Sequence, residues 1–214
     1  MRHGMFAATP MGDTAVNWDR TGMRNNLKSV LAAAVFAVLL SACAGASLKD
    51  SAGQNPAFDP RAFFAGRLQA HGMFQKPSGR NVNRLVADMD ASWKGDTLTL
   101  DEHFTWSDGK RTRRVWTMVV DGPRSIKGWA SDVADTARGG WEGNAFHWEY
   151  PLLLEVDGST WKVWMDDWMW LVDRRTVLNR TRMSKWGFHL GDATLSIRQS
   201  GGDSLLADDL LPGK

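Results

Sequence analysis

Cysteine is almost absent from this sequence, which has a single Cys in 214 residues. One cysteine excludes an internal disulfide and every metal site built from several thiolates. Histidine is also sparse, and none of the four that follow the cysteine, at positions 71, 103, 147 and 189, stands at His-x-x-x-His spacing. The phosphate loop, the dinucleotide fingerprint and the Gly-x-Ser-x-Gly nucleophile motif are missing too. We therefore expect no metal, no cofactor and no enzyme of a familiar class.

An excess of charge of one sign is missing as well. The whole chain has a formal net charge of +2, with 26 basic and 24 acidic residues. Four of the basic and two of the acidic residues precede the lone cysteine, so the part that follows is formally neutral. Binding to nucleic acid depends largely on the neutralisation of phosphates. A neutral chain has no electrostatic reason for such binding, and we expect no nucleic-acid partner.

Long apolar runs are limited to one. Residues 30–40 form an uninterrupted apolar run of 11 residues. This run is too short to span a bilayer, which needs about 20 apolar residues. The basic residues Arg24 and Lys28 precede it, and Ser41, Ala42 and Cys43 follow it. This order is typical of a secretory signal. Three interpretations fit this segment: a lipoprotein signal that ends at Cys43, a plain signal peptide followed by an accidental cysteine, and a short membrane anchor.

Residues 40–43, Leu-Ser-Ala-Cys, resemble the lipobox of bacterial lipoproteins. The resemblance implies a diacylglyceryl group on the sulfur of Cys43, cleavage just before Cys43, and usually a third acyl chain on the new amino terminus. Two or three chains anchor a protein stably where one chain would not. Ala44, rather than an aspartate, follows the cysteine. In a Gram-negative bacterium, this predicts anchoring in the outer membrane, facing the periplasm. Membrane lipid, reached through acylated Cys43, is thus a predicted partner.

Composition divides the chain into five parts. Residues 1–22 precede a basic start at Met23, and we interpret them as an upstream extension from a misassigned start. Residues 23–42 are the predicted signal peptide. Residues 43–60, rich in Ala, Gly, Ser and Asn, are predicted to be a lipidated flexible tether. Residues 61–200 are the predicted β-barrel domain, and the tail 201–214 is predicted to be disordered.

After the tether, apolar and polar residues alternate in short segments that end at turn signals. Such alternation is typical of β-strands with one buried face, and Asp108-Gly109 is a strong hairpin signal. The predicted strands cover residues 64–75, 82–92, 97–106, 111–120, 125–133, 144–153, 161–172, 176–183 and 193–199.

A convincing helical period is absent from this part, where the best candidate is one short helix over residues 132–138. Eight or nine strands at hairpin spacing predict an all-β fold. We expect an antiparallel meander that closes into a barrel or forms a strongly curled sheet. An outer-membrane barrel is the rival interpretation. The faces that carry Arg111 and Arg113, or Lys162 and Asp166, lack the apolar band that lipid contact requires.

Tryptophans and acids on strands are the unusual features that remain. Eleven of the 12 tryptophans lie in the predicted exported part, and large rings both fill a core and line apolar ligand sites. Glu102 shares the phase of the apolar residues of its strand, so we expect it to point inward, with Arg113 or Arg114 as its partner. Asp166 and Asp167 are adjacent and should point to opposite faces. Structural ion pairing is the alternative to a functional role for these acids.

Five segments carry a family resemblance: FFAGRLQAHGMFQ, TLTLDEHFTWSDG, RRVWTM, DDWMWLVD and NRTRMSKWG. With the lipobox, and in this order over roughly residues 55–198, they resemble the bacterial lipoproteins of the domain-of-unknown-function 3833 family. The resemblance implies a one-domain, β-rich lipoprotein with no established activity and no assigned catalytic residue. By analogy only, such a barrel is similar to lipocalin-type binding proteins.

The candidate ligand-binding residues are polar and aromatic side chains on these strands and motifs: Glu102, Arg114, Trp116, Trp148, Asp167, Trp168, Arg180 and Lys185. No catalytic residue is predicted. The polar residues Asn179, Arg180 and Lys185 are not explained by the alternation of a simple strand. The alternative to ligand binding is that their hydrogen bonds close one end of the barrel.

Three functions fit these features. The leading one is a membrane-anchored module that binds an apolar or amphipathic small molecule, a lipid or a fatty acid, in the barrel. The second is a structural or assembly lipoprotein that docks a protein partner through exposed tryptophans. The third is a lipid-modifying enzyme in which Glu102 or Asp167 acts as acid or base.

Overall fold

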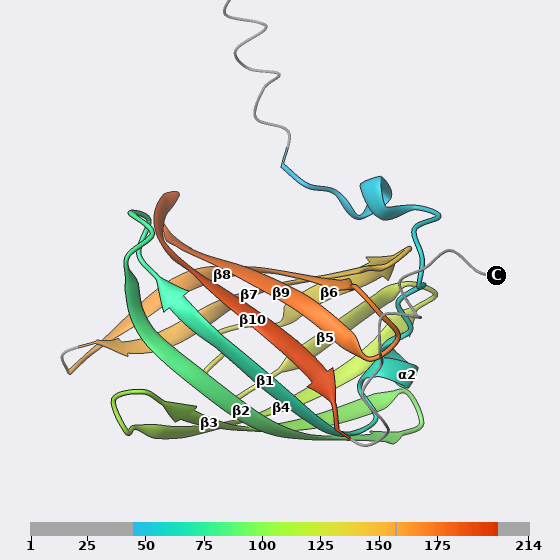
Figure 1. Cartoon of the computed structure of the whole chain (residues 1–214), viewed down its shortest axis with the longest axis horizontal. Helices are drawn as coiled ribbons and strands as arrows, with labels where there is room; N and C mark the ends of the chain where they lie inside the picture. Colours follow the sequence, from blue (N-terminus) through green and yellow to red (C-terminus); the bar gives the residue numbers. More distant parts are fainter. Residues whose placement is uncertain (1–44, 157, 201–214) are drawn as a thin grey trace, which may run out of the picture. The chain divides into compact units, whose positions relative to one another are not determined.

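The computed structural model describes residues 45–156 and 158–200, in which ten strands form a closed antiparallel barrel (Figure 1). The predicted signal peptide, Cys43 and the tail 201–214 lie outside the described residues. The strands are β1 (Gly66–Gln75), β2 (Asn81–Lys94), β3 (Thr97–Trp106), β4 (Arg111–Gly122), β5 (Ser125–Trp129), β6 (Ala137–Glu142), β7 (Ala145–Val156), β8 (Ser159–Leu171), β9 (Thr176–Lys185) and β10 (Phe188–Gln199). No helix of the described residues is long and apolar enough to cross a membrane.

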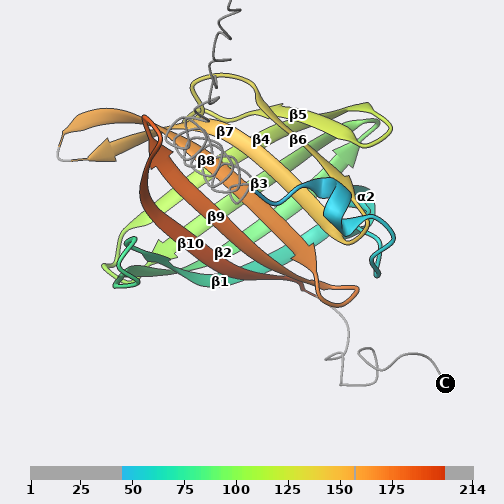
Figure 2. The same ribbon diagram turned by 90° about the horizontal axis from the view of Figure 1, so that it is seen from above.

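Each strand pairs with its neighbours in the chain, and β1 pairs with β10 to close the barrel (Figure 2). The β1–β10 ladder runs from Leu68 opposite Gln199 to Gln75 opposite Asp192. Closure leaves no unpaired sheet edge along this seam. The all-β antiparallel meander predicted from the sequence is confirmed, and of the two predicted forms the structure has the closed barrel.

Strand β6 is absent from the sequence prediction, and the helix predicted over residues 132–138 is wrong. The alternation in β6 is hidden by Gly139 and Gly140, which have no side chains. A Cβ at Gly139 would lie 2.2 Å from the carbonyl oxygen of His147, so glycine is required by the close approach of β7. Residues 130–136, which we call the strap, run beside β7 instead of coiling. The Ala134 N–H donates to the Pro151 carbonyl, and the Leu153 N–H donates to the Asp132 carbonyl.

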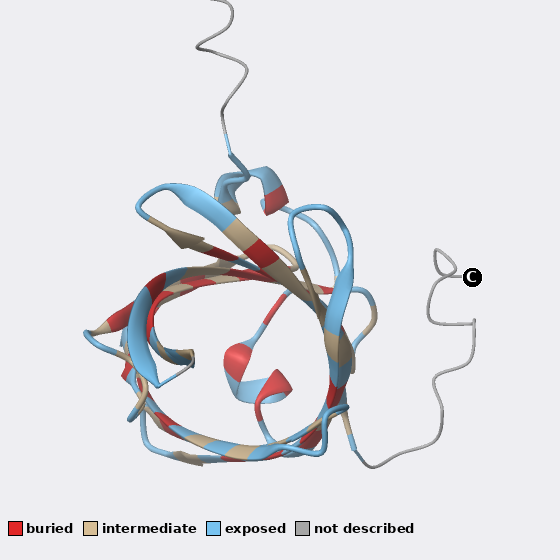
Figure 3. Ribbon diagram, turned by 90° about the vertical axis from the view of Figure 1, so that its left-hand side faces the viewer, coloured by how far each residue is buried: buried red, intermediate tan, exposed pale blue. Residues whose placement is uncertain are grey.

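One end of the barrel is closed by a short segment before β1. Helix α2 (Pro60–Phe63), capped by the Asp59 carboxylate, lies inside the ring of strands (Figure 3). Phe58, Phe63 and Phe64 are buried there, and Phe58 stacks on Phe146 of β7 with the ring centroids 5.4 Å apart. Phe58 and the 3-10 turn η1 (Leu48–Ser51) fall in the segment predicted to be a tether. Part of that segment therefore belongs to the folded domain.

The other end is formed by the β1–β2, β3–β4, β7–β8 and β9–β10 hairpins. Side chains alternate between lumen and surface along each strand, as the period of two requires. Near the closed end the inward side chains are buried. Toward the hairpin end, which we call the mouth, several inward side chains keep part of their accessible surface: Phe74, Phe104, Trp106, Thr112, Met165 and Leu195. Phenylalanines thus seal one end of the barrel, and side chains at the mouth are partly exposed.

Candidate functional site

A cluster of polar side chains lies inside the barrel, between the buried aromatic layer and the mouth. Glu102 of β3 and Arg114 of β4 are direct cross-strand partners on the inward face. Asp167 of β8, and Asn179 and Thr181 of β9, are buried polar residues on the inward face of these two paired strands. Buried polar groups are costly unless they are paired. We call this set, together with Tyr150 of β7 and Asp132 of the strap, the lumen cluster.

Arg114 fastens the strap to the lumen. Its guanidinium donates from Nε and Nη2 to the Asp132 carboxylate at 2.7–3.0 Å, a bidentate pair. The guanidinium also lies 5.7 Å from the ring centroid of Trp116 and 6.0 Å from that of Tyr150. Charge-assisted bidentate bonds are among the strongest hydrogen bonds in proteins. The pair therefore orders both Arg114 and the strap.

The strap fills a gap in the barrel wall. β5 pairs with β4 only over residues 117–122, and β6 pairs with β7 only up to Glu149. The halves of β4 and β7 that lie nearest the mouth therefore have no strand between them. The strap crosses this gap, with Val133 in an isolated bridge to Leu152. The Arg114–Asp132 pair thus closes the side of the lumen as well as lining it.

Asp167 is held by neighbours on β9. Its Oδ1 accepts a hydrogen bond from Thr181 Oγ1 at 3.0 Å and another from the Asn179 side-chain amide. The same amide donates to the carbonyl of Trp168 at 3.0 Å. Burial raises the pKa of Asp167 to about 6, and the hydrogen bonds from Asn179 and Thr181 oppose that rise.

Glu102 is the least satisfied member of the cluster. Burial raises its pKa to about 7; the nearby Arg114 charge lowers it, and the Asp167 and Asp132 charges raise it. Its Oε2 is buried without a hydrogen-bond partner among the described residues, as is the indole Nε1 of Trp148. Most buried polar groups have a partner, so each orphan calls for an explanation. A ligand in the lumen would supply one.

The cluster has three carboxyl groups for one guanidinium. Burial also raises the pKa of the Tyr150 hydroxyl above its usual range, with smaller contributions from the carboxylates. Tyr150 therefore stays neutral and can donate a hydrogen bond. With Arg114 already paired to Asp132, the remaining groups favour a neutral or cationic polar group over an anion.

Five of the eight residues predicted from the sequence lie together in the lumen: Glu102, Arg114, Trp116, Trp148 and Asp167. The expected inward position of Glu102 and the opposite faces of Asp166 and Asp167 are confirmed. Arg114 is the partner that shares the lumen, while Arg113 pairs with Asp101 outside. That these residues bind a ligand remains a prediction.

The other three predicted residues lie elsewhere. Trp168 and Arg180 are cross-strand partners on the outer face, because each is adjacent in sequence to an inward residue of the lumen cluster. They therefore lie apart from the lumen cluster, and their role as ligand-binding residues stays a prediction. Lys185 lies at the end of β9 by the mouth, where its Nζ is 3.8 Å from the ring centroid of Trp161 and 4.8 Å from that of Trp186.

Four members of the cluster are not among the ligand-binding residues predicted from the sequence: Asp132, Tyr150, Asn179 and Thr181. Three of them carried a usable signal. Tyr150 alternates in phase with Phe146 and Trp148, and Asn179 and Thr181 alternate in phase with the apolar residues of β9. Asp132 carried none, because its position depends on the path of the strap.

Replacing Glu102 with glutamine is expected to flatten the dependence of stability on pH. The folded-state pKa of about 7 lies above the ordinary value of 4.5, so the native state retains a proton that the unfolded state loses. This contribution is complete below pH 4.5 and is lost as the pH rises through 7. We expect Glu102→Gln to resemble the parent at pH 4.5 and to be about 1–3 kcal/mol more stable at pH 8.

Urea unfolding of the full chain between pH 4.5 and 8 measures this difference. Glu155→Gln, at an exposed position near the end of β7, is the control and should follow the parent curve. A Glu102→Gln curve parallel to that of the parent at every pH would contradict the buried, proton-binding state of Glu102.

Comparison with known proteins supports the fold and leaves the activity open. The sequence matches the family described as a protein of unknown function, DUF3833, over residues 37–199. No curated protein matches it significantly. The S-type phycobiliprotein lyase CPES from Guillardia theta has a similar structure, with a TM-score of 0.50, 8% identity, and coverage of 65% of this chain and 89% of that chain. Rv2717c from M. tuberculosis aligns with a TM-score of 0.49 and 15% identity over 69% of this chain and 99% of that one. At 8% identity the likeness to the lyase shows the fold alone, a closed β-barrel.

Proposed function

Since the chain belongs to the DUF3833 family, whose description assigns no activity, we propose a function from the lumen itself: the barrel binds an amphipathic, lipid-like small molecule. The observation that carries the proposal is Glu102 Oε2, a polar atom on the inward face of the barrel that is buried without a partner among the described residues. The ligand's polar group lies at the lumen cluster, and its apolar part extends toward the mouth.

The shape of the barrel supports this orientation. Phenylalanines close the end beyond the cluster, so a ligand enters from the mouth. Most inward side chains between cluster and mouth, including Phe104, Trp106 and Met165, are apolar and partly accessible. Small-molecule sites are mostly apolar with a few placed polar groups, which is the composition found here.

The charges of the lumen cluster limit which polar group the proposed ligand can have. A carboxylate would face Glu102, Asp167 and Asp132 with only one guanidinium to bind it. A hydroxyl, amide or amine can donate to Glu102 Oε2 without this repulsion. Of the lipids and fatty acids expected from the sequence, we therefore favour a lipid with an uncharged or cationic polar group.

Native mass spectrometry of the full chain in detergent tests the proposal with three probes: monopalmitoylglycerol, hexadecylamine and palmitate. We expect binding of the first two in preference to palmitate. Met165→Trp, which adds bulk to the lumen, should weaken binding by about tenfold or more, whereas Ser196→Trp on the outer face should not. Equal binding by both variants, or no binding of any probe, would overturn the proposal.

Acylation of Cys43 and a periplasm-facing position at the outer membrane belong to the same proposal. They rest on the sequence, since Cys43 lies outside the described residues. An anchored barrel would lie next to a source of its ligand, because the membrane that anchors it also contains lipids.

Docking of a protein partner is the second candidate function, because large apolar side chains are exposed beside the mouth. Trp186 is 87% exposed and Phe188 is 73% exposed, and Trp161 lies across Lys185 from Trp186. Exposed apolar patches mark interaction sites. A photo-crosslinker placed at position 186 in intact cells should capture one specific protein, and the absence of any crosslink would count against this role.

A further inference from the structure

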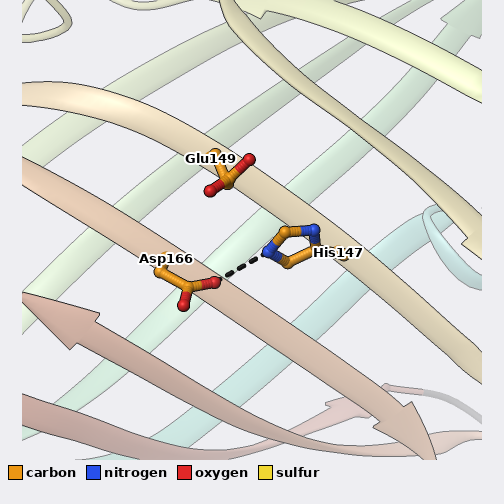
Figure 4. Close-up of side chains that lie close together, drawn as sticks. All are labelled: His147, Glu149 and Asp166. Atoms are coloured by element: carbon orange, nitrogen blue, oxygen red, sulfur yellow. Dashed lines mark hydrogen bonds and ion pairs between the residues drawn. The ribbon is translucent and has the colours of Figure 1, made fainter. Parts of the chain in front are cut away.

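Three potential metal ligands meet on the outer face of the barrel, on β7 and β8 (Figure 4). They are His147 and Glu149 of β7 and Asp166 of β8. One ligand atom from each lies within 4.8 Å of the others. His147 Nε2 is 2.7 Å from Asp166 Oδ1. All three side chains are half-buried, and none belongs to the lumen cluster.

The strand geometry brings these side chains together. Residues 147 and 149 are two apart on one strand and therefore share a face. Asp166 is the direct cross-strand partner of Glu149. The His147 ring stacks on Trp168, with the centroids 4.1 Å apart and an interplanar angle of 23°. Opposite His147, β6 has Gly140, where a Cβ would lie 2.4 Å from the Arg124 carbonyl oxygen. The imidazole is thus oriented by packing before any ion binds.

We propose that His147, Glu149 and Asp166 form a site for a divalent transition metal of the Zn²⁺ type. One imidazole nitrogen and two carboxylate oxygens are ligands that Zn²⁺ accepts, and three protein ligands leave a fourth position open. The two carboxylates balance the charge of the ion. Glu149 has no hydrogen bond or ion pair with the described residues, so its carboxylate is free to take this role.

An independent feature adjoins the site. Glu149 also lines a surface hollow of about 290 Å³, together with Arg138, Lys162 and Trp164. Asp135 lines the hollow as well, so its two cations, Arg138 and Lys162, are matched by two carboxylates, those of Asp135 and Glu149.

Neighbouring charges limit the affinity. Arg138 is the cross-strand partner of Glu149, and Arg182 is that of Asp166. Arg182 lies 3.8 Å from the Asp192 carboxylate, and this ion pair partly offsets the positive charge of Arg182 near Asp166. A hydrogen-bonded His147–Asp166 pair without a metal is the competing explanation of this geometry. The two explanations differ in whether the protein binds Zn²⁺ at a saturable site.

Titration of the chelator-treated full chain with Zn²⁺, followed by calorimetry, decides between them. We expect one saturable site per chain. His147→Gln and Glu149→Gln should each weaken binding by about tenfold or more. His189→Gln, which removes a histidine paired with Asp192 on β10, is the matched control and should bind as the parent does.

Co²⁺ absorption provides a second measurement, because a tetrahedral site gives an intense visible spectrum that loosely bound ions do not. Glu149→Gln guards against misfolding, since it breaks no hydrogen bond or ion pair among the described residues, and its circular dichroism should equal that of the parent. Absence of saturable binding, or affinities unchanged in both ligand variants, would overturn the site. Neither result would bear on binding in the lumen, because these residues face the other side of the wall.

Discussion

Replacing Arg114 with methionine is expected to lower the free energy of unfolding by about 3–5 kcal/mol at pH 8. The side chain of Arg114 is 18% exposed and is the cation of the lumen cluster, where it binds Asp132 and faces Glu102. Methionine keeps much of the volume but leaves these carboxylates without their counter-charge. Loss of one member of a buried ion pair is costly because the other remains charged and unpaired.

The loss should shrink at low pH, which identifies its electrostatic origin. Near pH 5, Glu102, with a pKa of about 7, and Asp167, with a pKa of about 6, are mostly protonated and need less counter-charge. The double variant Arg114→Met/Glu102→Gln should recover part of the stability at pH 8.

Urea denaturation at both pH values measures these effects. Arg113→Met is the matched control, since this neighbouring residue is 60% exposed and pairs with Asp101 on the outer face. It should change stability by less than about 1 kcal/mol. An Arg114→Met loss of the same size at pH 5 and pH 8 would show that lost packing, rather than charge, dominates.

Replacing Trp148 with alanine is expected to cost about 3–5 kcal/mol. The residue is 2% exposed and lies edge-on to Trp116, with the ring centroids 5.6 Å apart. The wall is shaped around this indole. A Cβ at Gly139 would lie 2.5 Å from its Cε3 atom, and one at Gly128 would lie 3.1 Å from its Cη2 atom. Two strands have glycine where the ring needs room, so removal of the ring leaves a cavity that the backbone cannot fill.

Trp186→Ala provides the comparison, because this tryptophan is 87% exposed. Its loss should change the free energy of unfolding by less than about 0.5 kcal/mol. Thermal and urea unfolding of both variants measure the difference. If Trp148→Ala were as stable as Trp186→Ala, the indole would not be part of the packed core, and the layer that closes the lumen would need a different explanation.

Local alternation was sufficient to predict much of the fold and part of the candidate site. Each strand has a period of two, so Glu102 could be assigned to the lumen, and Asp166 and Asp167 to opposite faces, from neighbours a few residues away. The same rule would have assigned Asn179 and Thr181 inward and Trp168 outward. Trp168 and Arg180 were predicted from the motifs in which they stand. Their positions in the alternation of the strands were not considered.

What the sequence by itself determined is therefore local: nine of the ten strands, most of the turns between them, the inward or outward direction of side chains on those strands, and the family resemblance. Tertiary structure alone decided that β1 meets β10, that the strap crosses the wall, and that Asp132 reaches Arg114. It also decided that His147, Glu149 and Asp166 meet across two strands. The physical reason is that alternation depends on adjacent residues, whereas strand register and closure depend on contacts between segments far apart in the chain. No short spacing rule encodes those contacts, and the candidate sites of this protein are built from them.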